Sequence, residues 1–140
     1  MVWASNYKSR LARLIILQKL AVRLVTKSCH GCHTKELFSL HHILTIEQIR
    51  LMQTGEFMFC YKHDLLPKTF TDYFNTGSTS HSHYSRAASI YRIVFAHTRI
   101  FSVKVAGPTV WNNLPADIIN VPLFHLFKKR LCAYVLTLNN

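Results

Sequence analysis

Apolar positions repeat with helical spacing over four stretches of this chain. Between residues 7 and 27, apolar side chains cover one broad face of a helical wheel, and lysines and arginines gather opposite them. The pattern then predicts a short helix capped by Thr34 and ending at Leu40, and a longer helix beginning at Thr45. The last helix is expected to start near Pro122. Its apolar stripe runs in three- and four-residue steps: Leu123, Phe124, Phe127, Leu131, Tyr134, Val135 and Leu138.

The region between the third and last helices has a different pattern. Residues 68–89 have the composition of a loop. Residues 90–95 and 101–105 carry β-type residues, and Phe101, Val103 and Val105 alternate with smaller or polar residues. We therefore expect a β-hairpin near residues 90–105, ended by Gly107-Pro108. Pro108 would then occupy the first position of a short helix over residues 109–113.

These elements predict a mostly α protein, α+β in class, with three to four packed helices and a small β-hairpin. A length of 140 residues fits a single domain or a fragment of a larger protein. It divides into a helical part over residues 5–67, a loop over 68–89, and a hairpin, turn and C-terminal helix over 90–138. Gly31 is the residue expected to end the first helix.

The charge balance points to a polyanionic partner. Lysine and arginine number 17 against 6 acidic residues, so the net charge is +11, which favours RNA or DNA as the partner. Lys19, Arg23 and Lys27 follow one edge of the first predicted helix and suit phosphate contacts. Arg86, Arg92 and Arg99 alternate with aromatic residues, a pattern typical of single-strand binding. The alternative for both sets is a plain solvated surface.

The same composition bears on localisation. No stretch approaches the roughly 20 apolar residues of a membrane span. We expect an intracellular protein, nuclear or cytoplasmic. Residues 1–35 hold seven basic residues and no acidic one, so a mitochondrial presequence is the alternative.

The string C-H-G-C-H at residues 29–33 satisfies the C-x-x-C-H pattern of haem attachment. Cys29, Cys32 and His33 are also a candidate zinc set, but no second Cys/His pair follows at finger spacing. We interpret the string as a connector between two helices, with reduced thiols and neither a metal nor another cofactor.

Catalytic patterns do not emerge from the sequence. The carboxylates are scattered, and neither a phosphate-binding glycine loop nor a nucleophile elbow is present. We therefore expect a chain that is not an enzyme.

Several short motifs occur in a distinctive order. Leu17-Gln18-Lys19 precedes Arg23, and His33-Thr34 precedes Leu37-Phe38. Gly107-Pro108-x-x-Trp111-Asn112-x-Leu114-Pro115 is followed by Phe127-Lys128. In this order, from about residue 3 to 136, the chain resembles the C-terminal tail of the reverse transcriptase of LINE-type (non-LTR, jockey-like) retrotransposons.

The resemblance implies a remnant of an RNA-directed DNA polymerase that lacks the polymerase core and its metal-binding aspartates. Such a tail would bind template RNA or target DNA, or pack on the missing core; a purely structural module or a small zinc-stabilised domain is the alternative. Trp111 is expected to be a core anchor rather than a base-stacking platform. Asn112 is expected to satisfy backbone groups at its turn.

Overall fold

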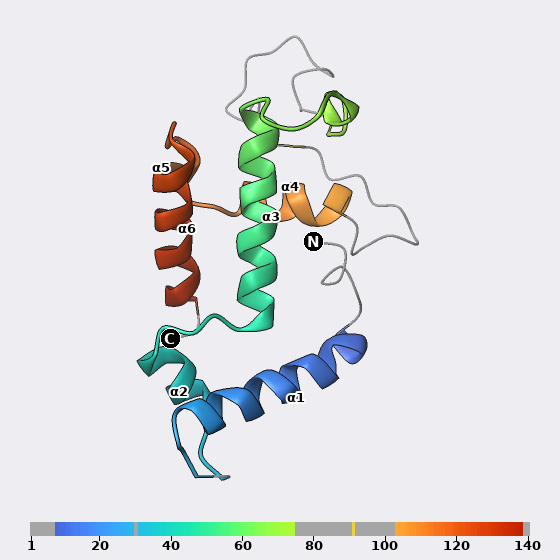
Figure 1. Cartoon of the computed structure of the whole chain (residues 1–140). Coiled ribbons are helices and arrows are strands. Elements are labelled where there is room, and N and C mark those ends of the chain that lie inside the picture. The colour runs from blue at the N-terminus through green and yellow to red at the C-terminus, as the bar shows by residue number, and fades with distance from the viewer. Residues whose placement is uncertain (1–7, 30, 75–90, 92–102, 139–140) are drawn as a thin grey trace.

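The computed structural model describes residues 8–29, 31–74, 91 and 103–138, and this part of the chain is helical (Figure 1). The six α-helices are α1 (Lys8–Val25), α2 (Thr34–Leu40), α3 (Ile46–Lys62), α4 (Val103–Asn112), α5 (Ala116–Ile119) and α6 (Phe124–Thr137), with a short 3-10 helix, η2 (Lys68–Phe70), after α3. The prediction of a mostly α protein is confirmed, whereas the predicted number of three to four helices is too low, since the described residues form six α-helices.

The core is centred on α3, which packs against α4 and α6. Helices α3 and α6 lie side by side and antiparallel (Figure 1). At one end the Gln48 side-chain amide donates to the Val135 carbonyl at 2.8 Å. Further along, a methyl group added at Gly55 would lie 2.7 Å from Cδ2 of Leu131, so the two helices approach closely because residue 55 has no side chain.

The apolar stripe predicted for the last helix is confirmed at its centre. Phe127, Leu131 and Val135 are each 0% exposed, and their four-residue spacing places them on one side of α6. The ends of the predicted stripe differ, since Leu123, Phe124 and Leu138 are exposed.

The predicted β-hairpin is wrong in its second strand. Val103 and Val105 lie in α4, and the described residues contain no hairpin. The alternation over 101–105 spans only three apolar positions, whereas Val105, Pro108 and Trp111 recur every three residues and all three are buried in α4. Of the first predicted strand, only residue 91 lies among the described residues.

Pro108 also differs from its predicted position. It is the sixth residue of α4 rather than the first, so the carbonyl of Lys104 receives no bond from it. An interior proline costs about 3 kcal/mol in a helix. Burial offsets this cost, since Pro108 is less than 2% exposed.

The predicted loop begins with ordered structure. The hydroxyl oxygen of Tyr61 lies 3.1 Å from the Thr71 carbonyl and 3.2 Å from the Phe74 carbonyl, either of which can accept its hydrogen, and it accepts from the Phe74 amide. Phe74 is 7% exposed and contacts the ring of Tyr91. Residues 71–74 are thereby fixed against the C-terminal half of α3, and residues 75–89 lie outside the described part.

Three helices end on non-glycine residues with left-handed backbone. Lys27, His42 and Asp64 have φ of 51°, 51° and 53° after α1, α2 and α3. At α1 the amide of Ser28 donates to the Arg23 carbonyl at 3.0 Å, which is the long bond of a Schellman motif. Gly31 was therefore the wrong helix terminator.

Candidate nucleic-acid interface

The basic edge predicted for the first helix belongs to a unit of α1 and α2 at the N-terminal end of α3 (Figure 1). Gln18 fastens this unit to the start of α3. Its amide donates to the Leu44 carbonyl at 2.8 Å, and its oxygen accepts from the Ile46 amide at 3.1 Å. A capping box between Thr45 and Gln48 completes the helix start. The amides of Ile46 and Gln48 at the start of α3 are thus bonded to side chains of the protein.

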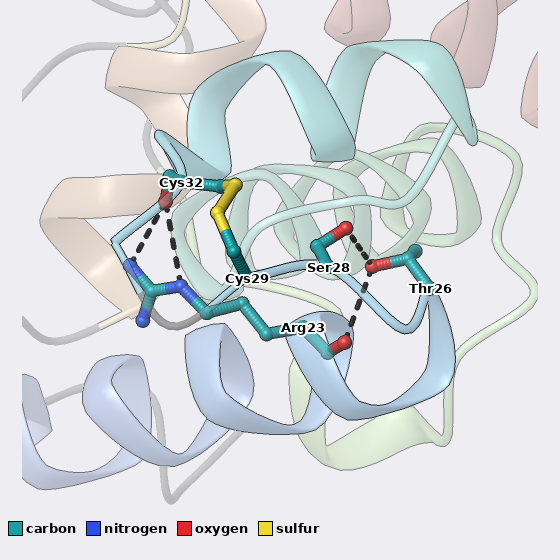
Figure 2. Close-up of a disulfide and its surroundings, with 5 residues drawn as sticks. All are labelled: Arg23, Thr26, Ser28, Cys29 and Cys32. Carbon is teal, nitrogen blue, oxygen red and sulfur yellow. Dashed lines mark hydrogen bonds between the residues drawn. A yellow bond between two sulfur atoms is a disulfide. The ribbon is translucent and has the colours of Figure 1, made fainter.

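The three predicted phosphate contacts on α1 are not equivalent. Lys19 and Lys27 are exposed. Arg23 is half-buried, and its Nε and Nη2 atoms donate to the Cys32 carbonyl at 3.4 and 3.1 Å (Figure 2). The chain turns back after α1, which brings this carbonyl to the guanidinium. Arg23 therefore has a structural contact, whereas the two lysines face solvent.

A cavity of about 340 Å³ lies between α1, α2 and the start of α3. Lys19 of α1 and Lys35 of α2 both line it, together with Glu47 of α3. The remaining lining residues are Ile15, Gln18, Thr34, Phe38, Thr45 and Ile46. Two lysine side chains from different helices therefore border one concave surface, together with the acidic side chain of Glu47. Lys35 was missed by the sequence reasoning, because only the turn between α1 and α2 brings it near Lys19.

One side of α1 is apolar and exposed. Among the α1 side chains that the structure describes, Leu11 and Val22 are buried. Other large apolar residues of α1 face solvent: Leu14, Ile16, Leu17, Leu20, Leu24 and Val25. Leu24 is 71% and Val25 80% exposed. The apolar face predicted for this helix thus packs on the rest of the chain over only part of its width.

The other predicted nucleic-acid contacts, Arg86, Arg92 and Arg99, lie outside the described residues. Basic residues near α6 make contacts within the protein. Lys128 pairs with Glu56 at 3.1 Å, Arg130 donates to the Asp117 carbonyl, and Lys62 donates to the Ile119 carbonyl. These surface contacts are individually weak, but they reduce the freedom of the side chains to reach a phosphate.

The Gly107 to Pro115 motif forms part of the core. Trp111 is 2% exposed and its ring lies 5.8 Å from that of Phe127, as expected for a core anchor. Asn112 accepts from the Tyr91 amide at 3.2 Å and donates to the Tyr91 carbonyl at 2.9 Å. It therefore satisfies the backbone of a residue 21 positions earlier, rather than that of its own turn.

The end of the same motif is also structural. Leu114 is buried, at 7% exposed. Pro115 is the residue that precedes α5. The motif residues therefore hold the helices together, and none of these contacts leaves the ring of Trp111 open for base stacking.

The prediction of reduced thiols is wrong for one pair of cysteines. Cys29 and Cys32 form a disulfide, with Cα atoms 5.5 Å apart (Figure 2). Their sulfur atoms are bonded to each other, so the zinc set of Cys29, Cys32 and His33 is not present in this form. Within residues 8–29, 31–74, 91 and 103–138, no group of three or more His, Cys, Asp or Glu side chains is placed to hold a metal ion.

Cys60 and Cys132 are free thiols. Burial raises the pKa of the Cys60 thiol, and the Glu56 carboxylate raises it further. The thiol is therefore protonated at neutral pH, which is opposite to what an activated nucleophile requires.

No helix in the described part of the chain has the length and apolar character needed to cross a bilayer. Comparison with known proteins returned no matching family model, no matching curated protein and no matching solved structure.

Proposed function

We propose that this chain is a non-catalytic C-terminal part of a LINE-type RNA-directed DNA polymerase, and that it binds nucleic acid at the α1–α2 end. The observation that carries this proposal is the convergence of Lys19 and Lys35 on one cavity, in a chain of net charge +11. The order of motifs along the chain supports the parent family.

Charge is concentrated at this end of the chain. Residues 8–35 contain seven lysines and arginines and no acidic residue. Lys19, Lys27 and Lys35 are exposed, and they come from two helices and the turn between them. Exposed ammonium groups can contact the phosphates of a nucleic-acid backbone, and such binding would release counterions from the backbone.

Salt-titrated binding of single-stranded RNA and DNA tests this proposal. Each phosphate contact on a single strand contributes about 0.7 to the slope of log affinity against log salt. The double variant K19Q/K35Q should therefore bind more weakly, with a slope reduced by about 1.4.

The matched control is K68Q/K129Q, which removes the same charge from exposed positions on η2 and α6. It should retain the slope of the unmodified chain. An equal loss in both variants would show that binding follows net charge alone, and would contradict an interface at α1 and α2.

The exposed apolar side of α1 favours a second candidate, an interaction module that packs on the absent polymerase core. Patches of this kind on a soluble chain usually mark a protein contact. The isolated chain should then self-associate as its concentration rises, as sedimentation velocity would show. The variant L17Q/L24Q should remain monomeric at the same concentration and keep its nucleic-acid affinity. Self-association that is unchanged in this variant would rule out α1 as the contact.

A further inference from the structure

The Cys29–Cys32 disulfide lies where a thiol in solution can reach it. It lies in the connector between α1 and α2, outside the core cluster. Cys29 is exposed and Cys32 is half-buried. A bridge between residues three apart closes a very small loop, and the constraint that a disulfide places on the unfolded chain grows with loop length. This bridge is therefore poorly placed to stabilise the fold.

The connector keeps its shape through other bonds. Thr26 Oγ1 donates to the Val22 carbonyl at 2.8 Å, and the Ser28 amide donates to the Arg23 carbonyl at 3.0 Å. Thr26 Oγ1 also lies 2.8 Å from Ser28 Oγ (Figure 2). These contacts do not involve sulfur. The end of α1 is therefore held by bonds that do not depend on the disulfide.

The surroundings of the pair are electropositive. The Arg23 guanidinium is held at the Cys32 carbonyl by two hydrogen bonds (Figure 2). Lys27 and Lys35 are exposed nearby in the sequence, and the nearest acidic residue along the chain is Glu36. Neighbouring cations favour the thiolate form of cysteine. The guanidinium bonded at the Cys32 carbonyl adds positive charge beside the Cys32 backbone, which favours departure of a thiolate from this residue.

We propose that Cys29 and Cys32 form a thiol–disulfide exchange site that reacts with low-molecular-weight thiols. The incoming thiolate attacks Sγ of exposed Cys29, the Cys29–Cys32 bond breaks, and its electron pair leaves on Sγ of Cys32. A second thiolate attacks the incoming sulfur of the mixed disulfide and releases Cys29. Two thiols are oxidised to one disulfide, the protein pair is reduced, and the two cysteine sulfurs take up two protons.

Glutathione buffers of graded redox ratio test the proposal on the full chain in a C60S/C132S background. After alkylation, mass spectrometry should show a native protein that gains two thiols reversibly, with the same midpoint from either direction. The additional substitution C32S should yield a single glutathione adduct on Cys29. A pair that is reduced only after urea unfolding would overturn the proposal, and so would a pair that never forms a disulfide in oxidised glutathione.

The role of the neighbouring cation has its own test. R23Q should slow reduction of the native pair severalfold, because it removes the positive charge held at the Cys32 carbonyl, on the residue from which the thiolate leaves. K129Q, which removes a distant charge on α6, should leave the rate unchanged. Far-UV circular dichroism confirms that both variants remain folded. Equal rates in the two variants would refute the electrostatic argument.

Discussion

Substitution of Gly107 by alanine tests how tightly α4 packs on α3. An added Cβ would lie 2.6 Å from Sδ of Met58 and 3.1 Å from Cζ of Phe74. Favourable contacts between heavy atoms lie at about 3.5–4.0 Å, so Met58 would have to retreat by about 1 Å. Met58 is 0% exposed and Phe74 is 7% exposed, which leaves little room for such a shift.

Two effects of opposite sign determine how much Gly107→Ala changes the free energy of unfolding. Overpacking a filled core costs about 1–3 kcal/mol. Alanine is favoured over glycine inside a helix by about 1 kcal/mol. Gly107→Ala should therefore lower the free energy of unfolding by about 1 kcal/mol, measured as a lower urea midpoint at constant m-value by far-UV circular dichroism.

A double-mutant cycle isolates the contact. Met58→Ala alone should cost about 2–5 kcal/mol, because it leaves a cavity. The double variant of Gly107 and Met58 should cost at least about 1 kcal/mol less than the sum of the single variants, since the new methyl group no longer meets sulfur. Gly31→Ala is the control, because a Cβ there meets nothing within 4 Å. Additivity within about 0.5 kcal/mol would refute the reasoning.

Three further predictions concern other contacts. Asn112→Ala should lower the free energy of unfolding by about 1–3 kcal/mol, because it leaves the backbone amide and carbonyl of Tyr91 without partners; an unchanged urea midpoint would contradict this. His42→Gly should raise the thermal midpoint through a gain of about 0.5–1 kcal/mol, since φ at His42 is 51°; His41→Gly, at a φ of −96°, should not. Burial raises the pKa of the Cys60 thiol and that of the Tyr91 hydroxyl above their ordinary values. Both groups are neutral in the folded chain, so the free energy of unfolding is highest below about pH 9 and decreases as the pH rises and the unfolded chain ionises. The urea midpoint measured against pH should fall in that range, and C60S should remove the part of the fall that occurs at the lower pH.

A helix of this chain was predictable where its buried residues recur every three or four positions along the sequence. Phe127, Leu131 and Val135 show the repeat of α6 directly in the sequence. Helix α4 was not predictable in the same way, because its start reads as a strand and Pro108 lies inside it. Contacts with α3 determine that this segment is a helix and not a strand, and no local sequence pattern shows that Gly107 lies against Met58.

Helix ends and the candidate interface depend on the turns. Sequence rules favour glycine for a left-handed residue, yet Lys27 takes that conformation and Gly31 does not. The same turn brings the Cys32 carbonyl to Arg23 and places Lys35 beside the cavity that Lys19 lines. The sequence therefore predicted that basic residues would form the interface. Which of them lie together depends on how the chain turns between α1 and α2, and the sequence does not show this.

Helix α1 carries both the basic edge and the exposed apolar side, so salt should act on the two proposed roles in opposite directions. Added salt screens the charges of Lys19 and Lys27 and weakens counterion-driven binding to nucleic acid. The same screening reduces repulsion between chains of net charge +11. Contact between apolar surfaces such as that around Leu24 does not depend on charge, so self-association should increase as nucleic-acid binding falls. A chain whose binding and self-association fall together with salt would have to use one charged surface for both.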